Sequence, residues 1–166
     1  MIRLANIEDL DCIMPLFKKA QLDLRMRKVN QWQNGYPNVE IITKDIEQKK
    51  AYVLIDEDRI KGYYFMDNYE SDYDYIEEEW LNNYPYIVIH RICIDLNERG
   101  LNLGNELIQD IKNKAKKQNK SIRIDTHKDN DAMNNFLIKH EFKKVGIIYL
   151  KNHDARNAYH YVEKER

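Results

Sequence analysis

The sequence predicts a mixed α/β domain of the α+β class. Apolar runs around a short polar turn form a meander in the first half of the chain, and later apolar runs alternate with segments of helical periodicity. Strands that first form a meander and then alternate with helices define this fold class. The 166 residues include only three Pro and five Gly, which leaves little linker material. One domain over residues 1–166 is therefore expected.

The N-terminal third is predicted to hold a strand, a long helix, a loop and a short helix. Residues 2–4 are apolar enough for the strand. Asn6 is a good N-cap for the long helix, whose apolar residues recur at helical spacing up to Leu24. Residues 30–38 contain Asn-Gly and Pro-Asn pairs and form a loop, and residues 39–49 form the second helix.

The middle of the chain supplies the strongest strand. Residues 51–55 and 59–66 flank a polar turn and predict an antiparallel hairpin. Residues 67–83 carry seven acidic residues and are expected to leave the sheet. Residues 86–94 are apolar on both faces, which predicts a central strand.

The C-terminal part alternates helices and strands. Apolar residues at helical spacing from Leu103 to Ala115 mark a helix. A strand, a helix and two strands follow in chain order, at residues 121–127, 130–140, 142–150 and 157–164.

Charge and hydropathy argue against two function classes. Lys and Arg total 27 against 28 Asp and Glu, whereas a nucleic-acid-binding protein usually has a basic surplus. No apolar run approaches the length of roughly 18 residues that would span a membrane, and the N-terminus meets acidic residues before an apolar signal sequence could form. We therefore expect a cytoplasmic protein without nucleic-acid or membrane partners.

The loop at residues 99–104 is the most informative segment. It holds Arg99, Gly100 and Gly104 directly before an amphipathic helix. Unpaired N–H groups and a partial positive charge at a helix N-terminus, with an Arg beside them, can hold a phosphate or pyrophosphate. The loop matches neither the P-loop nor the G-x-G-x-x-G pattern. The two glycines could equally form a turn that allows close helix packing.

The segment "IHRICIDLNERGLNLGNELI" resembles the acetyl-CoA loop of the GNAT superfamily of N-acetyltransferases. The family signature is Arg/Gln-x-x-Gly-x-Gly/Ala, and Arg99 and Gly104 occupy its first and last positions. Asn102 replaces the middle Gly, which is a mild departure because Asn tolerates positive φ better than other non-glycine residues.

Downstream segments are similar to the same family. In "DTHKDNDAMNNFLIKHEF", Asn130 and Phe142 match family positions, whereas Glu141 replaces a Gly. The loop "QWQNGYP" and the segment "GIIYLKNHDARNAY" also look like those of bacterial members, so the resemblance covers nearly the whole chain.

The resemblance implies a fold and a cofactor site. The expected fold is a twisted, mostly antiparallel sheet of six to seven strands with splayed central strands, flanked by about four helices. Acetyl-CoA would be the co-substrate, and no metal is implied. Backbone groups of Ile92, Cys93 and Ile94 would bind the pantetheine arm, and Asn130 would contact CoA. The pyrophosphate would lie against the backbone N–H groups of Arg99, Gly100, Leu101, Asn102, Leu103, Gly104 and Asn105.

The implied reaction is direct acetyl transfer to a primary amine, which must first lose a proton. With a pKa of about 10.4, an alkylamine is a free base in only about one of a few thousand molecules at pH 7. His90 in the central strand is the first candidate to accept the proton, and a hydrogen-bonded core histidine is the alternative. Residues 77–79, all Glu, could act through water. The family's general acid Tyr is replaced by Leu137, so Tyr149 or solvent would protonate the thiolate.

Two other kinds of chemistry are weaker alternatives. Cys93 could be a nucleophile, but a Cys between Ile residues in a strand is more typical of a core. Asp125 and His127 share one face of their predicted strand and could hold a metal with His90, although a third ligand is speculative.

The acceptor site is expected to be walled by aromatic and polar residues, namely Trp32, Gln33, Tyr36 and Trp80. The acidic segment favours a cationic acceptor, either a small molecule or a peptide. A catalytically weak CoA-binding sensor and an acetyltransferase toxin acting on charged tRNA are the alternatives. Homodimers are frequent in the family, so a homodimer is a further expectation.

Overall fold

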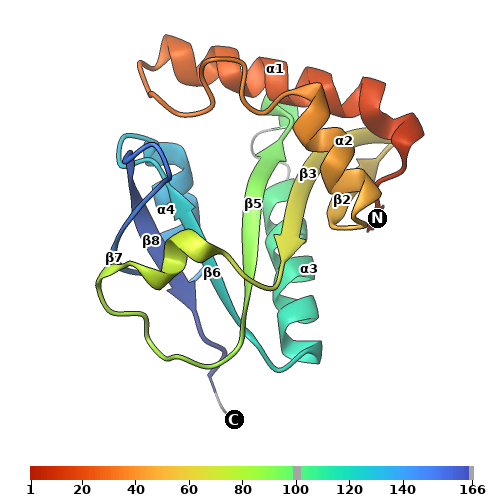
Figure 1. The fold of residues 1–166 in the computed structure, drawn as a ribbon. Coiled ribbons are helices and arrows are strands. Elements are labelled where there is room, and N and C mark those ends of the chain that lie inside the picture. Colours follow the sequence, from red (N-terminus) through yellow and green to blue (C-terminus); the bar gives the residue numbers. More distant parts are fainter. Residues whose placement is uncertain (99–101, 165–166) are drawn as a thin grey trace. The chain divides into compact units, whose positions relative to one another are not determined.

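The structure is a computed structural model and describes residues 1–98 and 102–164 (Figure 1). Within these residues the helices are α1 (Leu10–Met26), α2 (Val39–Glu47), α3 (Leu103–Lys117) and α4 (Asp131–Lys139). The strands are β1 (Ile2–Leu4), β2 (Ala51–Asp56), β3 (Arg59–Asp67), β4 (Glu77–Glu78), β5 (Tyr86–Ile94), β6 (Ser121–Thr126), β7 (Lys143–Tyr149) and β8 (Ala155–Tyr161). Three short 3-10 helices are η1 (Ile7–Asp9), η2 (Ser71–Asp74) and η3 (Leu96–Glu98). This confirms the predicted class and the order of the elements.

The strands form a mixed sheet in the order β1-β2-β3-β5-β6-β8-β7-β4. β5 and β6 are parallel and their register joins Tyr86–Val88 to Ser121–Arg123, whereas β1/β2, β2/β3, β6/β8, β7/β8 and β4/β7 are antiparallel. The described part of the chain has eight strands where six to seven were expected. The additional strand is β4, which is two residues long and therefore too short to show an apolar period.

The chain divides into two compact units. Unit 1 comprises Met1–Met66 and His90–Asp110, and unit 2 comprises Asp67–Ile89 and Ile111–Arg166. The chain passes between the units at the end of β3, within β5 and within α3. No helix in the described ranges is both long and apolar enough to cross a membrane.

Unit 1 has a core between its two N-terminal helices and the hairpin β2–β3 (Figure 1). The buried side chains of this core include Phe17 of α1, Ile42 of α2 and Tyr63 of β3. Phe17 and Tyr63 meet edge to face with ring centroids 5.1 Å apart. The apolar stripes that predicted the two helices are therefore the faces that they bury.

Unit 2 joins the acidic segment to the C-terminal strands. Glu77 and Glu78 of β4 pair with Ile147 and Gly146 of β7. A side chain at Gly146 would clash, because a Cβ there would lie 2.0 Å from the backbone oxygen of Glu77. The segment is thus anchored to the sheet by backbone pairing as well as by side chains.

Candidate active site

The connection from β5 to α3 is where the anion site is predicted. Arg99, Gly100 and Leu101 lie outside the described residues. Asn102 has φ of 61°, and its side-chain oxygen accepts a hydrogen bond from Asn105 Nδ2 at 3.2 Å. The left-handed conformation that a glycine would adopt here is therefore compatible with this sequence.

The start of α3 has donors for an anion. The backbone N–H of Glu106 donates to the Asn102 carbonyl at 3.1 Å. The N–H groups of residues 103–105 come earlier in the chain and are the donors at this helix end that an anion could bind. The one acidic side chain of the first turn, Glu106, pairs with the Met1 ammonium at 3.2 Å. This terminus fits a phosphate group, because its helix dipole and its first N–H groups would attract an anion.

The short helix η3 that precedes the loop is held by a buried lysine. Lys61 of β3 is only 4% exposed and lies 3.2 Å from Glu98, 3.1 Å from Asp56 and 3.4 Å from Glu57. Hydrogen bonds with Asp56 and Glu98 raise the pKa of Lys61 to about 12. The Lys61 backbone carbonyl also accepts from Asp95 N–H at 2.8 Å. Lys61 therefore stays charged and fixes the residues just before Arg99.

The strand residues predicted to bind pantetheine lie in unit 1, with Ile92 and Cys93 buried and Ile94 half-buried. Burial raises the pKa of the Cys93 thiol to about 12, and its sulfur lies 3.7 Å from the Leu16 carbonyl. A thiol with this pKa is protonated at neutral pH, so the geometry argues against Cys93 as a nucleophile.

His90 and Arg91 lie side by side along β5 but differ in environment. The half-buried His90 ring stacks on Phe65 with centroids 6.0 Å apart and an interplanar angle of 22°. Arg91 forms a two-pronged ion pair with Asp45 of α2, at 2.7 and 2.8 Å. Sequence reasoning missed this pair. Arg91 interrupts a largely apolar strand, which is a usable signal for a buried charge, but Asp45 lies among other charged and polar residues of α2 and gives no such signal.

The predicted acceptor loop belongs to unit 1 and is fixed by hydrogen bonds. Trp32 packs on Phe17 with ring centroids 5.4 Å apart. The Gln33 amide donates to the Gln21 carbonyl at 3.1 Å, and the Tyr36 hydroxyl accepts from Arg91 Nη1 at 2.9 Å. Tyr36 is 39% exposed, which leaves its ring available at the surface.

Three other predicted residues lie in unit 2. Asn130 is the N-cap of α4, and its side-chain oxygen accepts from Met133 N–H at 3.2 Å. Leu137 is fully buried in α4. The hydroxyl of Tyr149 donates to Glu77 at 2.8 Å, and this hydrogen bond raises the pKa of the Tyr149 phenol. Tyr149 therefore keeps its proton at neutral pH, as a general acid must.

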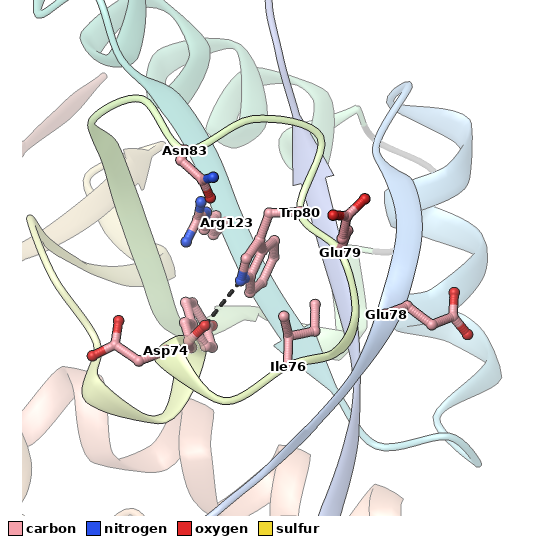
Figure 2. Close-up of a pocket in the computed structure, with 8 residues that line it drawn as sticks. Asp74, Ile76, Glu78, Glu79, Trp80, Asn83 and Arg123 are labelled. Atoms are coloured by element: carbon pink, nitrogen blue, oxygen red, sulfur yellow. Dashed lines mark hydrogen bonds between the residues drawn. The ribbon is translucent and has the colours of Figure 1, made fainter.

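The acidic segment forms a cavity of about 270 Å³ within unit 2. Figure 2 shows Trp80 and Arg123 next to one another inside the segment, whereas Glu78 points outward. The indole N–H of Trp80 donates to the Tyr73 carbonyl at 2.9 Å. The full lining is Tyr73, Asp74, Ile76, Glu78, Glu79, Trp80, Asn83 and Arg123.

Arg123 holds the cavity wall to β6. Its guanidinium stacks on the rings of Trp80 and Tyr86, 4.2 and 4.1 Å from their centroids, and donates to the Asn82 carbonyl at 2.9 Å. Because this cation is already sandwiched between two rings, it acts as an internal anchor for the segment. The exposed carboxylates at the rim leave the outer face negative.

Asp125 and His127 are each engaged in a hydrogen bond with another residue of unit 2. Asp125 accepts from the Tyr73 hydroxyl at 2.6 Å, and His127 Nδ1 accepts from Asp129 N–H at 3.0 Å. In the part of the chain that the structure describes, no three His, Cys, Asp or Glu side chains are grouped so that they could hold a metal ion.

Comparisons with known proteins define the class. A family model for the acetyltransferase (GNAT) domain matches residues 21–153, so the chain belongs to the GNAT family and is an N-acetyltransferase. A GNAT-family acetyltransferase from Streptococcus agalactiae 2603 is 31% identical, with a TM-score of 0.89 over 99% of this chain and 96% of that chain.

Two further structures are similar. An acetyltransferase from Staphylococcus aureus Mu50 is 27% identical, with a TM-score of 0.73 over 96% of this chain and 97% of that chain. The ribosomal-protein-alanine N-acetyltransferase of Brucella melitensis is 13% identical and shares the fold, with a TM-score of 0.70 over 98% of this chain and 99% of that chain. Among curated protein sequences, none matches this chain.

Proposed function

We propose that residues 1–166 form one domain that transfers the acetyl group of acetyl-CoA directly to a primary amine of a cationic small molecule or peptide. The observation that carries this proposal is the φ of 61° at Asn102, a left-handed conformation open to both Asn and Gly, so the substitution in the signature is compatible with the site. Membership of the GNAT family supports the choice of acetyl-CoA as donor.

In this proposal each of the following residues has a separate role. Backbone groups of Ile92, Cys93 and Ile94 hold the pantetheine arm, and the N–H groups at the start of α3 hold the pyrophosphate. Acetyl-CoA supplies the activated thioester. His90 accepts a proton from the ammonium of the acceptor so that the free amine can attack the thioester, and Tyr149 or solvent protonates the leaving thiolate. Asn130, the N-cap of α4, contacts CoA.

The acidic segment supports a cationic acceptor. Residues 67–85 hold seven of the 28 acidic residues and none of the 27 Lys and Arg. Burial raises the pKa of Asp72, and the neighbouring carboxyl group of Glu70 adds to the rise. A bound cation would relieve this crowding, and the exposed rings of Tyr75 and Tyr84 add faces that attract cations.

Calorimetry tests the cofactor part of the proposal. Acetyl-CoA and free CoA are titrated into the wild type and into Arg99→Ala, Gly104→Val and Asn130→Ala. Micromolar affinity that falls in all three variants supports the site. Absence of binding at millimolar acetyl-CoA by a folded wild type refutes it.

A panel of amines tests the acceptor. CoA release is measured with a polyamine, an amino sugar and a Lys-containing peptide, and with neutral amines of similar size. Preference for neutral or anionic amines would refute the cationic acceptor. The buried Leu137 at the position of the family's general acid favours one second candidate, a CoA-binding sensor. Binding of acetyl-CoA without turnover of any amine would select that candidate.

The setting that we propose is the cytoplasm, where acetyl-CoA and small amines are available, with neither nucleic acid nor membrane as partner. A homodimer is part of the proposal by family likeness, and light scattering of the purified protein tests it.

A further inference from the structure

β5 departs from regular strand geometry at one residue. Arg91 has φ of 52°, between His90 and Ile92. Several other non-glycine residues with positive φ lie two residues after the end of a helix, such as Asn119 and Glu141, where a left-handed residue is common. A left-handed bulky residue inside a strand is strained and persists only where its surroundings hold it.

A buried network holds this conformation. Both oxygens of the Asp45 carboxylate accept hydrogen bonds from Arg91, and the Tyr63 hydroxyl donates to the same carboxylate at 2.7 Å. Burial disfavours the charge of Arg91, but hydrogen bonds and charge interactions with Asp45 and Tyr36 together outweigh it and raise the pKa of the guanidinium. The Phe65 ring lies 4.4 Å below the guanidinium. A fork-shaped pair of this kind fixes direction as well as charge.

The same guanidinium reaches the acceptor loop. Its remaining prong, Nη1, donates to the Tyr36 hydroxyl at 2.9 Å. The Gln21 amide donates to the Tyr36 carbonyl at 2.8 Å, so Tyr36 is fixed at its backbone and at its tip. One arginine thus joins the loop at residues 30–38 to the strand that carries His90.

We propose that Arg91 and Asp45 are positioning residues, which hold the His90–Ile92 backbone and the Tyr36 side chain in a single arrangement for acetyl transfer. The inference rests on the proposed function. If the pair between Asp45 and Arg91 is weakened, the strand relaxes at Arg91, and the His90 and Tyr36 side chains lose their positions. A misplacement of about 1 Å at a reacting centre can cost on the order of 10²-fold in rate.

The variants separate the two links. Asp45→Asn keeps the shape but removes the charge, Arg91→Lys keeps the charge but removes the fork, and Tyr36→Phe cuts only the link to the loop. The matched control is Asp9→Asn, which breaks a similar two-pronged pair with Arg3 at 2.7 and 2.9 Å elsewhere in unit 1.

Two readouts are measured on each folded variant. The first is the split between kcat and KM, with the panel amine that the wild type acetylates best. The second needs no activity and is acrylamide quenching of Trp32 fluorescence in a Trp80→Phe background, which reports on the acceptor loop. Thermal melts show how much of each variant is folded.

The expected result is a large loss of kcat in Asp45→Asn and Arg91→Lys, on the order of 10²-fold, with little change in Asp9→Asn. Tyr36→Phe should raise KM for the amine and increase Trp32 quenching while kcat changes little. Wild-type kcat, KM and quenching in folded Asp45→Asn would overturn the inference. If Asp45→Asn does not fold, unchanged KM and quenching in Tyr36→Phe overturns it. A wild type that neither binds acetyl-CoA nor acetylates an amine refutes the proposed function instead.

Discussion

His160 makes the stability of the acidic segment depend on pH. This residue of β8 is fully buried, and its Nδ1 accepts the Leu81 N–H at 3.0 Å. Because Nδ1 is an acceptor, the proton of the neutral ring lies on Nε2, which faces Ser121 Oγ at 2.8 Å. A second proton on Nδ1 would oppose the Leu81 N–H. The ring is therefore held in its neutral form.

The magnitude follows from the two pKa values. Burial and the nearby Arg123 charge lower the pKa of His160 to about 4, whereas an unfolded histidine has a pKa of about 6.5. As the pH falls below 6.5, the unfolded chain takes up the proton first, so stability is lost until the pH passes about 4. Between pH 7.5 and 5.0 this one group should lower the free energy of unfolding by about 2 kcal/mol.

Urea unfolding at about pH 7.5 and 5.0 measures this effect. Other groups also titrate over this range, so the wild type is compared with His160→Asn, whose amide oxygen can still accept from Leu81. The variant should lose about 2 kcal/mol less stability than the wild type on acidification. The exposed His153→Asn is the control and should behave as the wild type does. Equal losses in the wild type and His160→Asn would refute the reasoning.

Two other substitutions test the anchors of the segment and of the loop. Gly146→Ala places a Cβ 2.0 Å from the Glu77 carbonyl, so it should cost about 1–3 kcal/mol in urea unfolding and expose Trp80 to quenching. Unchanged stability would mean that β4 does not pair as described. Lys61→Met removes the partner of Glu98 just before the anion loop, so acetyl-CoA affinity in calorimetry should fall several-fold while far-ultraviolet dichroism is retained. Wild-type affinity in this variant would show that η3 does not depend on Lys61.

The acidic segment is attached to unit 2 by several kinds of interaction. Backbone pairing joins β4 to β7, the Trp80 ring stacks on Arg123, and Leu81 donates to His160. These interactions respond differently to acid, because only the last depends on a histidine, whose ring must stay neutral to accept the Leu81 N–H. Acidification should therefore release the segment first near Leu81.

Local patterns in the sequence were sufficient for most of the helices and strands. The run at residues 86–94 is apolar on both faces and forms β5 with those bounds, and Asn102 adopts a positive φ, which Asn tolerates better than other non-glycine residues. Asn130 caps α4, because its side chain can satisfy a backbone N–H three residues later. Period, capping and turn chemistry act over a few residues, so they can be read from neighbours in the chain.

The partners of the charged and aromatic side chains were decided by the tertiary structure alone. Asp45 and Arg91 are 46 residues apart, and Leu81 and His160 are 79 apart, so no local pattern pairs them. Arg91 and His160 stand in largely apolar strands, whereas Asp45 has other charged residues beside it, so the sequence left many partners chemically acceptable. Burial removes that freedom, because a charge without water must meet the one opposite charge that the packed chain brings to it. The left-handed conformation of Arg91 and the neutral state of His160 are consequences of these long-range contacts.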